Sequence, residues 1–305
     1  MQNTTMPPVT RFAPSPTGYL HLGHVVNAIY VWGLARAAGG RVLLRIEDHD
    51  RIRSRPTFEA AILDDLSWLG FIPDEGLVPL RRQSDNGPAY ARALARLAAT
   101  HGVYACACSR TQIARARRLT ASAGQGAEWY PGTCRRRRLQ PGDDVPLGVG
   151  IRVQLDNAEE RFVDGAVGEV LQTPAEQCGD LLLKDRDGNW TYQFAVTVDD
   201  IDDGVDFVVR GLDLLSSTGR QITLARMLGR TNPPHFFHHP LIVKPDGEKL
   251  SKASGDTGVR ELRQGGMDAA TVIGLAAATV GLVERGANVP ADVVAGLFAD
   301  SVRGR

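Results

Sequence analysis

Two histidines near the start of the chain, in His21-Leu22-Gly23-His24, have a spacing suited to binding a phosphate group. They follow a proline-rich turn and open an apolar pattern of helical period, so both should lie at the N-terminus of a helix. Residues three apart share a helix face, and a helix N-terminus favours anions. Gly23 lacks a side chain, so a nucleotide base or ribose could approach closely. Taken alone, the motif is also consistent with a helix start that carries two surface histidines.

A second group of charges lies near the other end, in Lys249-Leu250-Ser251-Lys252-Ala253-Ser254-Gly255. Only four of the 35 basic residues are lysines, and three of these four lie between residues 244 and 252. A lysine ammonium places a compact point charge on a phosphate group, which the planar guanidinium does less well. The small residues and Gly255 are typical of a loop, from which two lysines can reach one polyphosphate. A solvated basic loop is the alternative.

The elements expected around these motifs alternate between strand and helix. They are a strand over 9–11, a helix over 21–38, a strand over 42–46, and helices over 56–69 and 89–99. After residue 190 the α/β pattern returns, with segments 193–198 and 207–210, a helix over 216–228 and a strand over 236–243. This alternation predicts a parallel sheet with crossover helices. Both motifs then follow carboxyl ends of strands, where open α/β sheets bind ligands.

Two regions depart from this pattern. Residues 100–190 contain many glycines and no sustained period, and we expect an inserted subdomain there. A helical tail is expected from 268 to 302. The chain has 305 residues, of which 43% are hydrophobic and 23% charged, so it can form two domains with a substantial core.

Composition excludes several classes of protein. The 35 basic and 35 acidic residues cancel, so the net charge does not indicate a nucleic-acid partner. No apolar run reaches the roughly 18–20 residues that cross a bilayer. The first ten residues lack the basic segment and apolar core of a secretory signal. We therefore expect a soluble, cytoplasmic protein with no membrane partner.

The motifs resemble those of a known family. HLGH and KLSKA resemble the HIGH and KMSKS signatures of class I aminoacyl-tRNA synthetases. The strings RFAPSPTGYLHLGH, LLRIEDHD, TYQFAVTVDDID and VVRGLDLLSSTGRQ resemble the glutamyl-tRNA synthetase catalytic domain specifically, in order across residues 9–255. The resemblance implies an ATP-dependent ligase with a Rossmann-like catalytic domain in two halves, 1–99 and 191–255, separated by the subdomain 100–190. It would condense glutamate with ATP to glutamyl-adenylate and pyrophosphate.

The same resemblance implies an ATP site. Catalysis would depend on His21, His24 and Lys252, which stabilise the charge that develops on the phosphate oxygens. The remaining contacts to ATP, which would bind with Mg²⁺, would come from Gly23, Lys249 and Ser251.

A glutamate site is implied as well, formed by Arg11, Phe12, Ala13, Pro14, Ser15, Glu47, Tyr192 and Arg210. Arg11 and Arg210 are the candidate cations, because a guanidinium binds a carboxylate through two parallel hydrogen bonds. Glu47 is the candidate partner of the substrate ammonium. From the residues alone, Glu47 could instead pair with a nearby arginine, and Tyr192 could be a core residue.

The chain is short after the lysine motif. Only about fifty residues follow Lys252, where glutamyl-tRNA synthetases carry a large helical anticodon-binding region. We therefore expect a short helical tail over 256–305 and no anticodon-binding domain. This organisation resembles the glutamyl-Q tRNA(Asp) synthetase family, which activates glutamate without tRNA and attaches it to queuosine, the modified wobble base of tRNA(Asp). The implied partners are glutamate, ATP and the anticodon stem-loop of that tRNA.

Three alternatives stay open at this point. A truncated or discriminating glutamyl-tRNA synthetase would charge the tRNA 3′ end. A binding module would hold tRNA or a regulatory ligand without turnover. A small nucleotidyltransferase would use the HxGH motif alone, which leaves the glutamate-like strings unexplained.

The cysteines favour a metal site. Three of the four lie within 29 residues, and these are Cys106, Cys108 and Cys134. Such spacing makes a poor disulfide framework, and Cys178 lies apart with no assigned role. Three thiolates with one oxygen or nitrogen donor complete a structural zinc site. The family pattern CxC…YxxxC implies Tyr130 as the fourth ligand. His101 is the competitor, because a phenol must lose a proton of pKa near 10. Reduced, buried cysteines are the alternative without metal.

Arginines bracket this cysteine pattern. They are Arg115, Arg117, Arg118 and the run 135–138. Contact with tRNA phosphates is one interpretation and predicts an affinity that falls steeply as salt rises. An anticodon loop is a suitable target, because proteins read RNA sequence mainly in single-stranded loops. A solvated charged face is the alternative.

Overall fold

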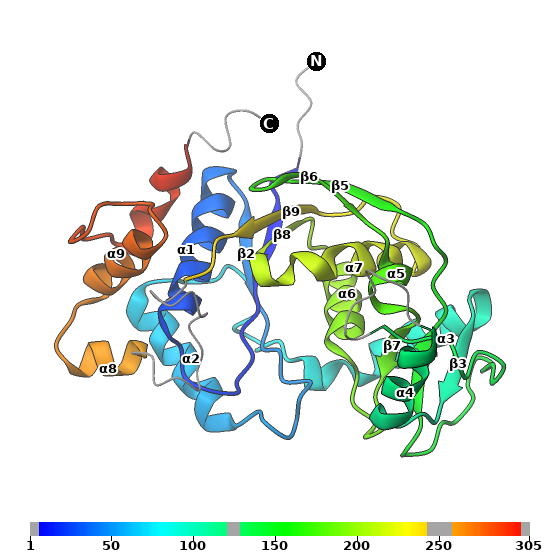
Figure 1. The fold of residues 1–305 in the computed structure, drawn as a ribbon. Coiled ribbons are helices and arrows are strands. Elements are labelled where there is room, and N and C mark those ends of the chain that lie inside the picture. The colour runs from blue at the N-terminus through cyan, green and yellow to red at the C-terminus, as the bar shows by residue number, and fades with distance from the viewer. Residues whose placement is uncertain (1–5, 121–128, 243–257, 300–305) are drawn as a thin grey trace. The chain divides into compact units, whose positions relative to one another are not determined.

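The computed structural model describes residues 6–120, 129–242 and 258–299, and the chain divides into two compact units (Figure 1). The first unit contains residues 1–85, 205–215 and 234–305, and the second contains 86–204 and 216–233. The predicted loop with Lys249, Ser251 and Lys252 lies outside the described residues. No helix in the described part is both long enough and apolar enough to cross a membrane.

Parallel strands form the centre of the first unit. They are β1 (Val9–Phe12), β2 (Arg41–Leu44), β8 (Phe207–Gly211) and β9 (His235–His239). β1 pairs with β2 and β8 pairs with β9, in each case in parallel. β8 begins beside β1, because the Asp206 N–H donates to the Val9 carbonyl at 3.1 Å and the Val9 N–H donates to the Asp206 carboxylate at 2.7 Å. The predicted parallel sheet is confirmed, and its carboxyl ends share one edge, where ligands bind in this fold class.

Helices pack against these strands around one apolar core. They are α1 (Leu22–Ala37), α2 (Pro56–Leu69), α8 (Val259–Gln264) and α9 (Ala269–Thr279), with a 3-10 helix over Ala291–Phe298. Val25, Ile29 and Trp32 recur at helical spacing on α1 and are buried. α2 begins at Pro56, where a missing N–H costs nothing, and ends at Gly70, whose φ of 84° stops the helix.

The tail expected to be helical over 268–302 is helical only in part. α9 ends at Thr279, and the 3-10 helix begins at Ala291. Between them Gly281 and Gly286 adopt φ values of 75° and 85°, which an α-helix does not accommodate. These turns fold the tail back, so that Phe298 packs into the same core as α1.

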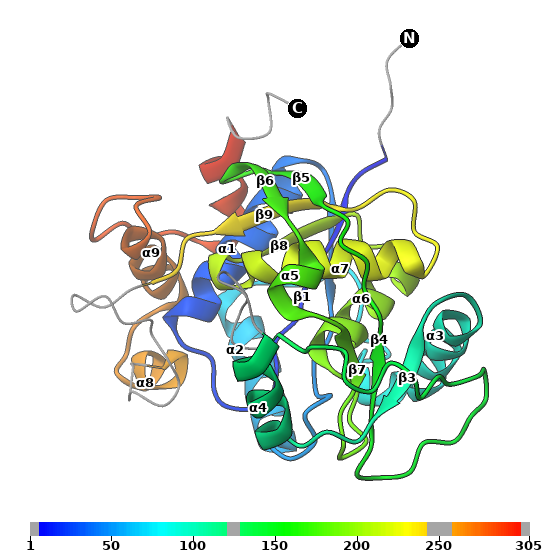
Figure 2. The same cartoon turned by 45° about the vertical axis from the view of Figure 1, so that its right-hand side comes forward.

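The second unit is built around antiparallel strands. β3 (Val103–Cys106), β4 (Gly150–Val153) and β7 (Leu181–Lys184) lie side by side in that order (Figure 2). β5 (Glu160–Asp164) and β6 (Gly168–Gln172) form a hairpin. These strands have only four or five residues each, and β3 and β4 lie far apart in the sequence, so residues 100–190 gave no sustained pattern.

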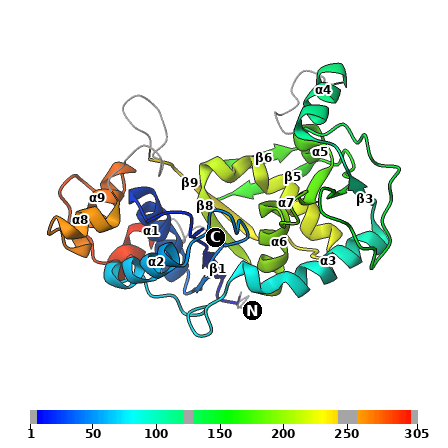
Figure 3. The same ribbon diagram turned by 90° about the horizontal axis from the view of Figure 1, so that it is seen from below.

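The helices of the second unit come from within residues 100–190 and from both sides of that segment. They are α3 (Gly87–Thr100), α4 (Arg110–Thr120), α5 (Pro174–Cys178), α6 (Tyr192–Asp202) and α7 (Leu215–Met227). Short 3-10 helices over Gln83–Asn86 and Leu212–Leu214 complete the regular elements described. The segment 193–198 lies within α6, and α3 and α6 pack side by side (Figure 3).

Candidate functional site

The two predicted histidines form the N-terminal cap of α1. His21 is the N-cap residue, and its Nδ1 accepts a hydrogen bond from the Gly23 N–H at 3.1 Å. His24 Nδ1 accepts from the His21 N–H, also at 3.1 Å, so the two imidazoles close a reciprocal capping box. Their ring centroids lie 3.9 Å apart. The structure thus brings both rings together at the end of the helix that favours a phosphate.

These capping bonds determine where the ring protons lie. Because Nδ1 accepts in both rings, each neutral imidazole carries its proton on Nε2 and contributes an Nε2–H donor. Gly23 also makes room for its neighbour, since an added Cβ would lie 2.9 Å from His21 Cε1. The described chain resumes beside this motif, where Gly258 forms a bridge with His21 and the Val259 N–H donates to the Leu20 carbonyl at 2.9 Å.

The two predicted carboxylate-binding arginines lie on β1 and β8. Arg11 and Arg210 are each only 4% exposed. Arg11 Nη1 donates to the Val209 carbonyl at 3.4 Å, which ties its guanidinium to β8. Arg210 Nε donates to His238 Nε2 at 3.0 Å, and its guanidinium lies 5.6 Å from the centroid of the Phe236 ring. Both guanidiniums are therefore held in buried positions near the carboxyl ends of parallel strands.

Glu47 follows β2 and is 5% exposed. Its carboxylate lies 3.5 Å from Arg45 Nη2, so the pairing with a nearby arginine that the sequence left open is present, although it is long. The Glu47 N–H donates to the Pro14 carbonyl at 3.0 Å, and the Arg45 N–H donates to the Phe12 carbonyl at 3.1 Å. These bonds attach the segment 12–15, which includes Ala13 and Ser15, to the chain after β2.

Tyr192 is the one predicted glutamate ligand in the second unit. It is the first residue of α6 and is half-buried. It does not belong to the apolar core of that unit, which surrounds Phe194. The other predicted glutamate ligands and both histidines all lie in the first unit.

Sequence reasoning missed the two histidines at the end of β9. One is His238, the acceptor for Arg210. The other, His239, stacks on Tyr30 at an interplanar angle of 17°, and its Nε2 lies 3.0 Å from the side-chain amide of Asn27 on α1. Burial lowers the pKa of His239 to about 4, so this ring is neutral at neutral pH. His239 thus joins the end of β9 to the helix that carries the HxGH motif. The signal was a pair of histidines that directly follow Phe236 and Phe237 at the end of a short strand.

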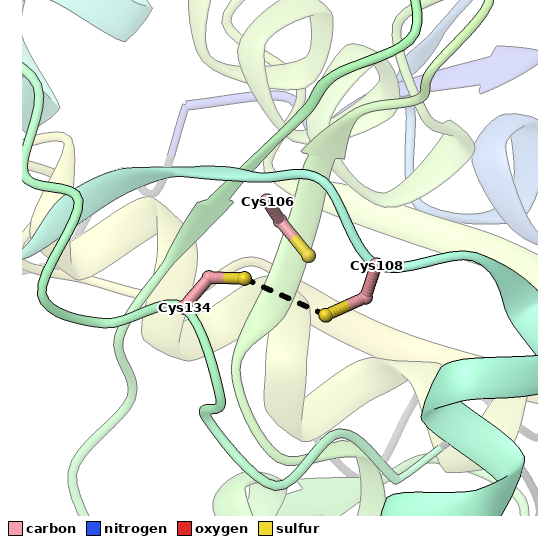
Figure 4. A group of neighbouring side chains, drawn as sticks. All are labelled: Cys106, Cys108 and Cys134. Atoms are coloured by element: carbon pink, nitrogen blue, oxygen red, sulfur yellow. Dashed lines mark hydrogen bonds between the residues drawn. The ribbon is translucent and has the colours of Figure 1, made fainter.

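The three clustered cysteines meet in the second unit (Figure 4). The Sγ atoms of Cys106, Cys108 and Cys134 all lie within 4.8 Å of one another, and the Cys108 and Cys134 sulfurs are 3.5 Å apart. A tetrahedral zinc ion with bonds of about 2.3 Å sets its sulfur ligands about 3.8 Å apart. All three are free thiols. The donor set therefore fits a zinc ion without rearrangement of the backbone.

Tyr130 presents its hydroxyl to this cluster. Its Oη lies 3.3 Å from Cys106 Sγ and accepts a hydrogen bond from the Cys134 N–H at 3.0 Å. Burial raises the pKa of the Tyr130 phenol, so this group stays protonated unless a bound cation offsets the loss of solvation. The Arg152 guanidinium lies 3.9 Å from the Tyr130 ring centroid, which adds positive charge beside it. An N–H donor and a nearby cation both favour the phenolate form.

The competing ligand, His101, lies at the C-terminal end of α3. Its Nδ1 is 2.7 Å from Thr100 Oγ1, and among the described residues it is not part of the cluster of metal-binding atoms. Cys178 lies outside that cluster as well, with its thiol donating to the Pro174 carbonyl at 3.2 Å.

The arginines around the cluster differ in their contacts. The run 135–138 is exposed, yet Arg135 forms two hydrogen bonds with the buried Asp180 carboxylate, at 2.7 and 2.9 Å. Arg138 donates to Gln154 at 3.3 Å. On α4, Arg115 and Arg118 are exposed and Arg117 is half-buried. Arg135 therefore supports the fold of the unit, which the sequence did not predict.

Comparison with known proteins agrees with this geometry. Residues 8–280 match the family described as tRNA synthetases class I (E and Q), catalytic domain. The chain is 44% identical over 270 residues to "Glutamyl-Q tRNA(Asp) synthetase" of Geobacter sulfurreducens, covering 87% of this chain and 83% of that protein. It is 42% identical over 245 residues to the protein of the same name from Pseudomonas paraeruginosa, covering 80% and 77%.

A solved structure extends the likeness to the fold. The glutamate-tRNA synthetase of Elizabethkingia anophelis superposes with a TM-score of 0.74 at 27% identity over 95% of this chain. The chain covers only 65% of that longer protein.

Proposed function

The chain belongs to the class I tRNA synthetases for glutamate and glutamine, and within them to the glutamyl-Q tRNA(Asp) synthetase family, and we propose that it attaches glutamate to the queuosine base of tRNA(Asp). Enzymes of this family are ATP-dependent ligases. In the proposed reaction glutamate is first activated with ATP in the absence of tRNA. The observation that carries the proposal is the pair of imidazoles at the N-terminus of α1, whose Nδ1 atoms accept backbone N–H groups, in the same unit as two buried arginines.

The first step forms glutamyl-adenylate. An oxygen of the glutamate α-carboxylate attacks the α-phosphorus of ATP, the bond from that phosphorus to the β-phosphate oxygen breaks, and pyrophosphate leaves. Negative charge builds on the phosphate oxygens in the transition state, so the enzyme has mainly to position the two reactants and to stabilise this charge. His21 and His24 donate from Nε2 to these oxygens, and Gly23 leaves space for the nucleotide. ATP binds together with Mg²⁺, which lowers the charge repulsion between the phosphates.

Glutamate is held by charges of opposite sign. Arg11 and Arg210 bind its carboxylates, and Glu47 binds its ammonium group. Burial strengthens these contacts, since the charges interact in a medium of low dielectric constant. Ser15 and Tyr192 supply hydroxyl groups, and Phe12, Ala13 and Pro14 shape the pocket next to them.

The lysine motif completes the ATP site in this proposal. Lys249, Ser251 and Lys252 contact the phosphates of ATP. Their place in the sequence supports this, because they precede Gly258 by a short stretch and Gly258 pairs with His21.

A structural zinc ion belongs to the proposal as well. Cys106, Cys108, Cys134 and Tyr130 would hold it, with no position left for a substrate. Its chemistry would be confined to fixing the β3–β4 region of the second unit.

In the second step a hydroxyl oxygen of the queuosine cyclopentene ring attacks the glutamyl carbonyl carbon, and the bond from that carbon to the phosphate oxygen of AMP breaks. An ester forms, the hydroxyl proton is released, and AMP leaves. We propose that residues 1–99 and 191–255 act as the catalytic halves, that 100–190 is the tRNA-binding insertion and that 256–305 is a short tail. The anticodon stem-loop is the part of tRNA(Asp) that is bound. The reaction takes place in the cytoplasm, where ATP and tRNA are available.

The activation step is tested by ATP–pyrophosphate exchange. Glutamate should drive exchange of labelled pyrophosphate into ATP with no tRNA present, and Lys252→Ala should remove it. Absence of exchange with the unaltered protein would contradict the proposal.

A second candidate is charging of the tRNA 3′ end, which the likeness to the Elizabethkingia enzyme favours. Queuosine-free tRNA(Asp) distinguishes the two. The proposed enzyme leaves this RNA unmodified and still catalyses exchange, whereas an enzyme that charges the 3′ end accepts it.

A further inference from the structure

A cavity of about 770 Å³ opens beside the cysteine cluster in the second unit. This volume lies within the roughly 300–1,000 Å³ typical of small-ligand sites. Cys106 and Cys108 form one side, and the other walls come from α4, from the loop before β4 and from the turn after β7. The cavity is much larger than a zinc ion, so the cysteine cluster accounts for only one edge of it.

Three arginines line this cavity. Arg110, Arg152 and Arg186 form no ion pair with any carboxylate of the described residues. Arg110 is exposed, and its side chain forms no hydrogen bond within the described chain. Arg186 uses only Nε, which donates to the Gly148 carbonyl at 2.6 Å. Their terminal nitrogens are donors that a bound anion would satisfy.

Arg152 is the buried member of this set, with 8% exposure. Its Nη1 donates to the Asp180 carbonyl at 2.8 Å, whereas its buried Nε has no partner in the described part of the chain. Its guanidinium also lies 3.9 Å from the centroid of the Tyr130 ring, so Arg152 is held beside the cysteine cluster. Arg110 and Arg186 are therefore the cavity arginines left for a ligand.

Two carboxylates also line the cavity, and one of them is already engaged. The Asp185 carboxylate accepts hydrogen bonds from the Asp187 N–H at 2.9 Å and from the Asn189 N–H at 2.8 Å. It therefore stabilises its own turn. Asp187 is exposed at the rim. The terminal nitrogens of Arg110 and Arg186 have no carboxylate partner in the described chain, so an anion can bind to these two side chains.

The same cavity has an apolar wall. Ile113 and Leu182 are half-buried, and Leu147 is 79% exposed. An exposed leucine beside unpaired arginines suits a ligand that has both a flat apolar face and a phosphate. One unstacked nucleotide of an RNA strand has this combination, because its base offers the face and its backbone the charge.

We propose that this cavity binds one unstacked nucleotide of the tRNA substrate, with Arg110 and Arg186 on its phosphates and Leu147 against its base. The inference rests on the proposed function for the identity of the RNA. The arginines of this cavity are not those that bracket the cysteine pattern in the sequence, because neither Arg110 nor Arg186 belongs to those clusters.

The test is equilibrium binding of a tRNA(Asp) transcript at several salt concentrations, compared between variants. Removal of two phosphate contacts in Arg110→Ala/Arg186→Ala should weaken binding about 25-fold at 0.1 M salt and make the slope of log K against log salt shallower by about 1.4. Leu147→Ala should weaken binding about five- to ten-fold with the slope unchanged. Arg92→Ala/Arg96→Ala removes two exposed arginines of α3, also in the second unit, and is the matched control.

Equal losses in the pocket variant and the control variant would overturn the proposal, since general charge would then explain the binding. Binding of GMP or inorganic phosphate that responds to Arg110→Ala/Arg186→Ala, while tRNA binding does not, would also overturn it. Glutamate-driven exchange is measured in the same preparations. Exchange that a variant retains shows that the variant is folded, whereas exchange by the unaltered protein tests the proposed function. Loss of exchange in the unaltered protein with the RNA result intact would count against the reaction and not against the pocket.

Discussion

At the N-terminus of α1, His21 combines a structural and a chemical role. Its Nδ1 caps the helix through the Gly23 N–H, and this contact leaves the proton on Nε2 for a phosphate. His21→Ala removes both roles. We expect a loss of about 1 kcal/mol in the free energy of unfolding from the missing cap. We also expect a fall of about 10²–10³-fold in exchange rate from the missing donor.

His21→Asn separates these roles, because asparagine is a good N-cap but presents no imidazole Nε2–H. This variant should recover the stability lost in His21→Ala, measured by denaturant unfolding, and should stay as slow in exchange. An asparagine variant that exchanges at the original rate would show that His21 is only a cap.

At this scale the sequence indicated the residue types but not their contacts. The HxGH spacing predicted a shared helix face, and the structure shows that face as a capping box. Arg210 was predicted from the resemblance of the sequence to a synthetase family. Its acceptor His238 was not predicted, because only the register of β8 with β9 places Arg210 and His238 side by side. Contacts of this kind depend on strand pairing, which one sequence does not contain.

At the scale of the element, α2 carries a buried carboxylate. Asp65 is 1% exposed, and neither of its oxygens has a hydrogen-bond partner in the described chain. Burial, helped by the charge of Asp64, raises the pKa of Asp65 to about 6. The folded state therefore binds this proton more tightly than the unfolded state, and Asp65 costs stability increasingly as pH rises from about 4 to 6.

Asp65→Asn removes that cost. The advantage of the variant in free energy of unfolding should be absent near pH 3.5 and should grow by up to about 3 kcal/mol by pH 7. Urea unfolding at a series of pH values measures it. Parallel pH profiles for the variant and the unaltered protein would contradict the assignment.

The second prediction at the scale of the element concerns zinc binding by the cysteine cluster. If the cluster holds zinc, the protein should contain about one zinc per chain by elemental analysis, and Cys108→Ser should lose it. Tyr130→Phe should weaken zinc retention against a chelator, while His101→Ala should not. Cys178→Ser is the matched control, because this thiol lies outside the cluster and should leave the metal content unchanged. Equal retention in Tyr130→Phe and the unaltered protein would exclude the phenol as a ligand.

Elements differed in how far sequence could predict them. α2 has a proline at its start and a glycine at its end, and its predicted bounds of 56–69 are those observed. The strands of the second unit are four or five residues long and gave no period. The sequence pattern of 193–198 did not identify it as a helix, because every residue from Phe194 to Asp200 on α6 is buried, polar residues included, so no exposed polar face marks a helical period.

At the scale of the molecule, the chain combines a unit of parallel strands with a unit that holds the cysteine cluster and an arginine-lined cavity. The first supplies the groups that suit adenylate formation, and the second supplies charges that suit RNA. We therefore expect that a mutation in one unit can impair glutamate activation or transfer to tRNA without impairing the other step. Changes at His21 should affect exchange, whereas changes at Arg110 and Arg186 should affect the use of tRNA.

The central claim concerns where glutamate is attached. Queuosine-containing tRNA(Asp) is incubated with the protein, ATP and glutamate, cut with a nuclease, and the fragments are weighed by mass spectrometry. The proposed function predicts one added glutamyl mass on the anticodon-loop fragment that contains queuosine. A glutamyl mass on the 3′-terminal fragment, with the anticodon loop unchanged, would contradict it.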